Sequence, residues 1–126
     1  MITSPQAIRV DRDGVGYGAT VSWRYEDRVW VVVIESPAFE PVEARAHDAF
    51  EALCLVRAEL EPHAWRIGVA GAQPDVWPSG MARDQGGGLS AYRMIGERAG
   101  EVVDTFLPVD PVTVTTVAEQ QARAAP

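Results

Sequence analysis

Side chains that could take part in catalysis gather in one segment, residues 75–92, which has the sequence DVWPSGMARDQGGGLSAY. Its only carboxylates, Asp75 and Asp84, could act together in acid–base hydrolysis or bind a divalent cation. The sequence pattern does not fix their separation. Because Arg83 adjoins Asp84 and Arg93 lies just beyond the segment, ion pairs within the protein are the simpler interpretation of both acids.

Two other patterns in this segment are incomplete as catalytic or phosphate-binding motifs. The three glycines at 86–88 could present converging N–H groups to a phosphate, but they precede an apparent strand rather than a helix. A flexible entry to that strand, or a bulge, is the favoured interpretation. Ser79 follows Pro78 and lacks the first glycine of a nucleophile elbow. We therefore expect Pro78 and Gly80 to shape a turn in which the Ser79 hydroxyl bonds to nearby backbone.

The remaining residues of the segment are typical of a binding surface. Trp, Tyr and Arg dominate protein interfaces because they combine a large contact area with directed hydrogen bonds, and Met adapts to irregular surfaces. The alternative is that Trp77 and Met81 fold inward and plug the end of a sheet. The predicted partner-binding residues are Asp75, Trp77, Ser79, Met81, Arg83, Asp84 and Tyr92.

The histidines and the cysteine give no catalytic or metal site. His47 and His63 lie at opposite ends of an expected helix, about 24 Å apart at ~1.5 Å per residue, so we do not expect them to share a metal ion. Cys54 is the only cysteine, which excludes an internal disulfide or a multi-cysteine zinc site. It lies beside the apolar stripe of that helix, where a buried, inert thiol is expected. We predict no catalytic residue, cofactor or metal.

Composition and charge narrow the class of protein. The chain has 126 residues, a length suited to one domain. Its net charge is −7. Residues 40–61 carry six acids against two arginines, and residues 97–110 carry four against one. Such a field repels nucleic acid and attracts a basic protein. The longest apolar run has six residues, residues 29–34, and the N-terminus has no secretory pattern, so we expect a cytoplasmic protein with no membrane segment.

The hydrophobic periodicity predicts an α+β fold. Alternating or β-branched stretches predict strands at residues 8–10, 19–26, 29–34, 42–46, 65–69, 89–95 and 101–107. Short turns between successive strands favour antiparallel pairing. The run at 29–34 is suited to a central strand buried on both faces, and residues 75–88 have no regular period, which predicts a loop.

Two helices complete the prediction. Asp48 and Glu51 form a variant capping box before an amphipathic stretch, and Asp110-Pro111 begins a C-terminal helix that extends to about Ala122. The fold class is therefore α+β over a single domain, 1–126. It has a mainly antiparallel sheet of five to six strands, one central amphipathic helix at about 48–61 on one face of the sheet, and the C-terminal helix.

The segment also resembles a family signature, D-V-[WY]-P-S-G-M-x-R-x-x-G-G-G, of small bacterial proteins similar to the immunity partners of polymorphic toxins. The resemblance extends from residues 50–53 to residues 103–106 and 119–120, roughly the C-terminal two-thirds of the chain. A basic residue expected just before Asp75 is Pro74 here, so no contact by such a side chain is expected. The residues that carry the signature are Asp75, Val76, Trp77, Pro78, Ser79, Gly80, Met81, Arg83, Gly86, Gly87, Gly88, Ala91 and Tyr92.

Three functional hypotheses follow. The leading one is a cytoplasmic, non-enzymatic immunity protein that binds and neutralises a cognate toxin, expected to be basic, by direct protein–protein contact. The alternative is a small-ligand or nucleotide-binding domain that uses the glycine-rich loop 80–88 and Arg83. The third is a hydrolase that uses Asp75 and Asp84. Neither nucleic acid nor membrane is an expected partner.

Overall fold

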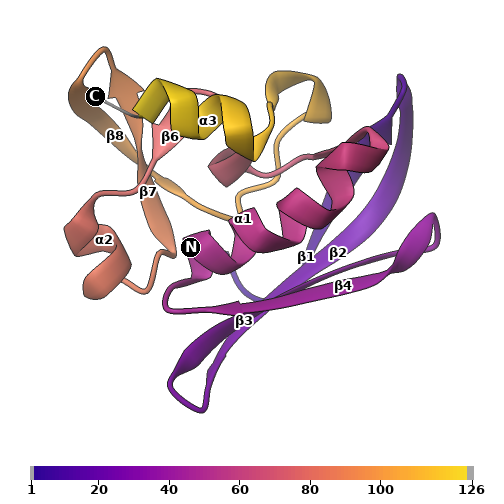
Figure 1. Ribbon diagram of the computed structural model, residues 1–126, viewed down its shortest axis with the longest axis horizontal. Helices are drawn as coiled ribbons and strands as arrows, with labels where there is room; N and C mark the ends of the chain where they lie inside the picture. The colour runs from indigo at the N-terminus through magenta and orange to yellow at the C-terminus, as the bar shows by residue number, and fades with distance from the viewer. Residues whose placement is uncertain (1, 125–126) are drawn as a thin grey trace.

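The protein is built around a curled, five-stranded antiparallel sheet that the helix α1 crosses on one face (Figure 1). The computed structural model describes residues 2–124. The strands run in the spatial order β4-β3-β2-β1-β5. Their bounds are β1 Gln6–Arg12, β2 Val15–Glu26, β3 Val29–Ser36, β4 Phe39–Ala46 and β5 Trp65–Ile67.

Two-residue turns join β1 to β2 and β2 to β3, and the sequence predicted the second of these two-residue connections. In both turns the two central residues have positive φ, the geometry that follows the right-handed twist of a hairpin. The first turn uses Asp13 and Gly14 at φ 54° and 84°, and the second uses Asp27 and Arg28 at φ 52° and 67°. Arginine has no preference for this conformation, so Arg28 is the unusual residue of the four.

Helix α1 spans Ala49–Leu60 and continues into a short 3-10 turn, η1, at Glu61–His63. The predicted cap is confirmed, since the Asp48 side chain accepts a hydrogen bond of 2.8 Å from the N–H of Glu51. The apolar stripe of the helix covers the sheet. The main core contains residues from both layers, among them Val10, Val21, Val32, Ile34, Leu53, Val56 and Ile67.

A second, three-stranded antiparallel sheet lies beside the start of α1, with the order β6-β7-β8. Its strands are β6 Val76–Trp77, β7 Ser90–Ile95 and β8 Arg98–Asp104. The predicted α+β class is confirmed, but the strands divide between two sheets instead of forming one. A second core fills the space between this sheet and α1, and it contains Phe50, Cys54, Ala70, Val76, Ala91 and Val103.

The C-terminal helix, α3, begins later than the sequence predicted, at Val117, and extends to Ala124. Asp110 does cap a helical turn, with its side chain accepting from the N–H of Val112, but that turn is the 3-10 helix η3 at Pro111–Thr113. The β-branched residues of the VTVTTV stretch are poor helix formers, so the turn does not propagate.

The predicted burial of β3 on both faces is only half correct. Val31, Val32 and Ile34 are fully buried, but Val33 is only partly so. Helix α1 covers one face, and the charged side chains of Arg24 and Arg45 flank Val31 from the neighbouring strands on the other. Within residues 2–124, no helix has the length and apolar character that crossing a bilayer requires.

Candidate functional site

The segment at residues 75–92, here called the motif segment, is more ordered than the sequence predicted. It contains β6, a five-residue helix α2 at Gly80–Asp84, and the start of β7. The prediction of a loop over residues 75–88 is therefore wrong for β6 and α2. Ser79 caps the N-terminus of α2, and its Oγ accepts a hydrogen bond of 3.0 Å from the N–H of Ala82. The expected bond between the Ser79 hydroxyl and nearby backbone is confirmed.

Arg83 fixes α2 to the beginning of α1. Its Nη1 donates to Asp48 Oδ2 at 3.2 Å and to Glu51 Oε2 at 3.4 Å. Its guanidinium also lies over two aromatic rings, 5.3 Å from the centre of Phe50 and 5.4 Å from that of Trp77. Planar stacking and paired carboxylates are the environment that arginine prefers. Only 22% of the Arg83 side chain is exposed, so it acts here mainly as an internal clamp.

The three glycines of the motif segment pack backbone against the rest of the protein. Gly87 and Gly88 have φ of +65° and +74°, and a Cβ at these positions would lie within 2.6 Å of the Trp30 ring and of Asp48 Oδ1 respectively. The Gly87 carbonyl accepts from the N–H of Ala49 at 2.7 Å, and so completes the N-terminus of α1. The glycines permit this close approach because they have no side chain.

The same glycines are not arranged as a phosphate cradle. The N–H groups of Gly86 and Gly88 both donate to the carbonyl of Ala82, at 3.1 and 2.9 Å. The carbonyl of Gly88 accepts from the Thr105 hydroxyl at 2.6 Å. These groups are therefore committed to internal bonds. The expected flexible strand entry is instead a tightly packed turn.

The two carboxylates of the motif segment face different hollows of the surface. Asp75 binds Arg93 through both of its oxygens, at 3.0 and 3.1 Å, and Arg93 also binds Glu101 at 3.1 Å. The Asp75 bond is the largest cause of a raised pKa for Arg93. Asp84 lies 4.0 Å from His47, and both side chains are exposed. The predicted ion pairing is confirmed for Asp75, and the structure does not bring Asp75 and Asp84 to one site.

Trp77 and Met81, which the sequence left as either contact residues or an inward plug, behave differently. Trp77 pairs with Tyr92 across β6 and β7, and its ring meets Phe50 edge to face, with the centres 5.4 Å apart. It is partly buried against the second core. Met81 is 69% exposed on α2. The plug interpretation therefore fits Trp77 in part and does not fit Met81.

Residues outside the motif segment extend the surface around α2. The β2–β3 turn comes beside α2, and a shallow hollow of about 360 Å³ lies between them. Tyr25 and Trp30 flank that turn with ring centres 5.4 Å apart, and Tyr25 is 61% exposed. We define the α2 surface as Tyr25, Arg28, Trp30, His47, Met81 and Asp84.

Only two of the seven predicted binding residues, Met81 and Asp84, are on the α2 surface. The structure uses the side chains of Ser79 and Arg83 to hold α2, and it places Asp75 and Trp77 on the wall of a separate pocket. Sequence reasoning missed the contribution of the β2–β3 turn. The available signal was Arg28, which occupies a turn position where glycine or asparagine is favoured.

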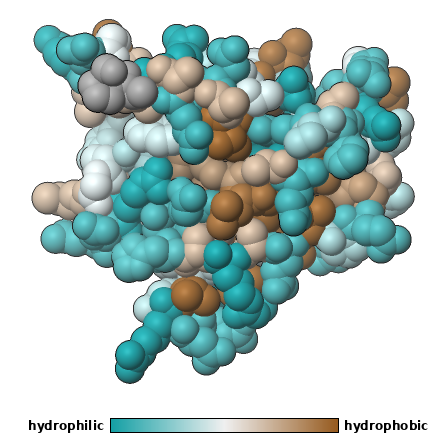
Figure 2. Space-filling view, viewed as in Figure 1, coloured by the Kyte–Doolittle hydropathy of each residue, from teal (hydrophilic) through white to brown (hydrophobic). Residues whose placement is uncertain are grey.

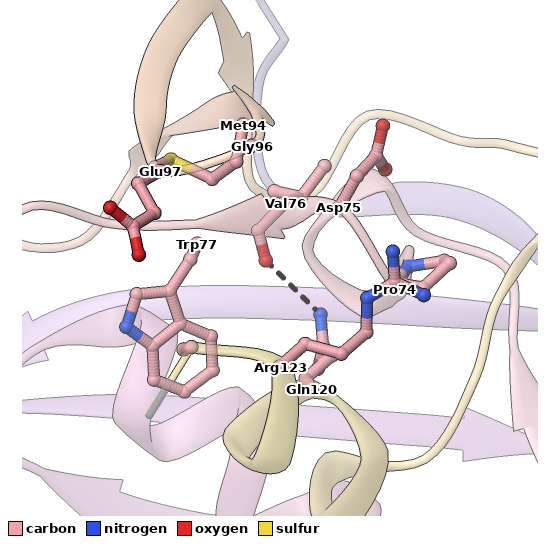
Figure 3. Close-up of a pocket in the computed structure, with 10 residues that line it drawn as sticks. Pro74, Asp75, Val76, Trp77, Met94, Gly96, Glu97, Gln120 and Arg123 are labelled. Carbon is pink, nitrogen blue, oxygen red and sulfur yellow. Dashed lines mark hydrogen bonds between the residues drawn. The ribbon is translucent and has the colours of Figure 1, made fainter. Parts of the chain in front are cut away.

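The separate pocket has a volume of about 500 Å³ and lies between the second sheet and α3 (Figure 3). Behind this pocket, the fully buried side chain of Arg57 connects α1 to α3. Arg57 donates to Glu61 at 2.9 Å, to the carbonyl of Thr115 at 2.8 Å and to Gln120. The Gln120 amide nitrogen in turn donates to the carbonyls of Gly71 and Gln73, both at 2.8 Å, and to that of Val76 at 3.3 Å.

Cys54 is buried, and the two carboxylates of the motif segment line different hollows. Burial raises the pKa of the Cys54 thiol to about 11, so the nucleophilic thiolate is scarce near neutrality. The expected buried thiol is confirmed. Among residues 2–124, no three His, Cys, Asp or Glu side chains are grouped so as to hold a metal ion.

Comparisons with protein-family models and with curated proteins find no match.

Proposed function

We propose that the chain is a cytoplasmic, non-enzymatic immunity protein that binds a cognate toxin through the α2 surface and neutralises it by direct contact. The observation that carries this proposal is the exposure of Met81 and Tyr25, at 69% and 61%, on a surface that other residues hold rigidly. Tyr25 also lies against the partly exposed Trp30, and exposed hydrophobic side chains that lie together are typical of a protein interface. The resemblance of the motif segment to immunity proteins supports the same function.

The rigidity of this surface supports binding by reducing the loss of conformational freedom on association. Arg83 ties α2 to α1, Ser79 caps it, and Gly87 approaches the ring of Trp30. Trp30 belongs to the β2–β3 hairpin, so the two parts of the α2 surface are held against each other. The motif segment thus supplies the support for the contact residues as well as two of them.

The chemistry of the α2 surface suits a basic partner. Tyr25, Trp30 and Met81 provide apolar contact area, and Asp84 and the neighbouring Asp27 provide negative charge beside the positive charge of Arg28. A net charge of −7 adds a long-range attraction to a basic protein. Figure 2 shows the hydrophilic character of the β2–β3 turn, which projects at the bottom of the view, and the hydrophobic residues across the middle of this face, over α1.

The experiment that tests the proposal is co-elution. The purified chain is mixed with the product of the neighbouring gene and separated by size-exclusion chromatography. We expect one complex, together with loss of the partner's toxicity when the two are expressed in one cell. Separate elution from the products of both neighbouring genes, with toxicity unchanged, would contradict the proposal.

Replacing Arg28 with glycine should make the protein more stable and its binding weaker. Glycine adopts φ near 67° without strain, so we expect the free energy of unfolding to rise by about 0.5–1 kcal/mol. Loss of the long Arg28 side chain removes contact area from the α2 surface, so the Kd for the partner should rise by about fivefold or more. Chemical denaturation and isothermal titration calorimetry measure the two effects.

The matched control for this variant is Ala64→Gly. Ala64 also has a positive φ, 70°, but it ends η1, away from the α2 surface. We expect it to gain similar stability and to leave the Kd unchanged. If Arg28→Gly binds as tightly as the natural chain, the β2–β3 turn is not part of the interface.

A further inference from the structure

The pocket between the second sheet and α3 has features of a small-molecule site that is distinct from the α2 surface. Its volume of about 500 Å³ falls within the range of about 300–1,000 Å³ that is usual for ligand pockets. Its residues come from β6 and the two residues before it, the β7–β8 hairpin and α3. They are Pro74, Asp75, Val76, Trp77, Met94, Gly96, Glu97, Gln120, Arg123 and Ala124.

One part of the wall of this pocket is apolar. Trp77 and Met94 are partly exposed there, and Val76 is buried behind them. Figure 3 shows the indole of Trp77 on one side of the pocket, with the sulfur of Met94 above it. An indole face and a thioether are favourable neighbours for an apolar or aromatic group. This part of the pocket therefore suits the hydrophobic portion of a ligand.

The charged groups of the pocket have opposite signs. Asp75 is already bound by Arg93, and the amide nitrogen of Gln120 is committed to backbone carbonyls. Glu97 and Arg123 are exposed, and within residues 2–124 neither takes part in an ion pair. They come from different elements, and Figure 3 shows them on different sides of the pocket. One free carboxylate and one free guanidinium suit a ligand that carries both an ammonium and a carboxylate.

We propose that this pocket binds a small zwitterion with an apolar or aromatic group, the chemistry of a free α-amino acid. Glu97 accepts from the ammonium, Arg123 donates to the carboxylate, and Trp77 and Met94 contact the side chain. The inference does not depend on toxin binding, because the pocket shares no residue with the α2 surface. Either proposal can fail while the other holds.

Three probes of similar size test the proposal by isothermal titration calorimetry. L-phenylalanine carries both charges, 2-phenylethylamine carries only the ammonium, and 3-phenylpropionate carries only the carboxylate. We expect L-phenylalanine to bind more tightly than either single-charge probe, by up to about fivefold, since one exposed charge contact contributes no more than about this factor.

Two substitutions at exposed positions separate the roles of the charged groups. Glu97→Gln should remove the advantage of L-phenylalanine over 3-phenylpropionate and keep its advantage over 2-phenylethylamine. Arg123→Gln should have the opposite effect. The matched controls are Glu119→Gln and Arg98→Gln, which remove the same charges outside the pocket and should leave all three affinities unchanged.

The proposal is overturned by any of three results with the folded protein. The first is that L-phenylalanine does not bind measurably. The second is that a single-charge probe binds as tightly as L-phenylalanine, which would indicate a site for an amine or an acid alone. The third is that the control substitutions weaken binding as much as those at Glu97 and Arg123.

Discussion

Replacing Arg57 with methionine is expected to lower the free energy of unfolding by about 3–5 kcal/mol, or to prevent folding. The Arg57 side chain is fully buried and Glu61 retains only 7% exposure. Without the guanidinium, the Glu61 carboxylate would keep only its bond from the N–H of Val117, and the side-chain oxygen of Gln120 would lose its donor. A buried charge without its partner is among the most destabilising changes in a protein core.

The expected loss of stability is large because every buried polar side chain around Arg57 has a hydrogen-bond partner in the native protein. Among residues 2–124, no buried side-chain nitrogen or oxygen lacks a hydrogen-bond partner. Arg57 joins α1 to the segment before α3 through the carbonyl of Thr115, and Gln120 joins α3 to the start of β6. Loss of Arg57 should therefore loosen α3 as well as destabilise the protein.

Chemical denaturation measures the effect, and Arg66→Met is the control. Arg66 is only partly buried, and its one recorded hydrogen bond is to the carbonyl of the adjacent Trp65 at 3.0 Å. We expect this control to lose less than about 1 kcal/mol. Equal losses for the two variants would show that the network does not contribute as described.

Replacing Gly88 with alanine is expected to lower the free energy of unfolding by about 2–5 kcal/mol. Two costs add at this position. The backbone has φ +74°, which an L side chain adopts with strain, and the new Cβ would lie 2.6 Å from Asp48 Oδ1 and 2.7 Å from the Phe50 nitrogen. The turn would have to move away from the N-terminus of α1, and the Arg83 clamp would be disturbed with it.

Gly96→Ala and Gly80→Ala separate the two costs. Gly96 has a similar φ of +63° but open space around its Cα, so we expect only the conformational cost, about 1 kcal/mol. Gly80 has neither a positive φ nor a close neighbour and begins α2, so alanine there should be neutral or stabilising. If Gly88→Ala is no worse than Gly96→Ala, the close packing of the glycine turn is not important for stability.

Local signals in the sequence predicted much of the fold. The Asp48 cap, the amphipathic α1 and the two-residue hairpin turns depend on neighbours within a few positions, so they can be inferred without tertiary information. The division into two sheets could not. Strand β6 has only two residues, too short to show a period, and it is formed by pairing with β7.

The contacts that support the α2 surface could not be predicted from neighbouring residues either, because they join residues that are distant in the sequence. Arg83 binds carboxylates 35 and 32 residues away in the chain, and Arg57 binds Gln120 63 residues away. The sequence identified the motif segment as exceptional. It did not show that most of the polar and charged side chains there make internal contacts, nor that the β2–β3 turn completes the exposed surface.

The affinity of Met81→Asp for the partner tests the role of the α2 surface most directly. A carboxylate at this exposed position should leave the fold intact and raise the Kd by at least about tenfold, because it replaces an apolar contact in the proposed interface. The matched control is Val112→Asp, at a residue that is 84% exposed in η3, outside that surface. We expect titration calorimetry to give an unchanged Kd for Val112→Asp. An unchanged Kd for Met81→Asp, with a stable complex still formed, would show that the partner binds elsewhere.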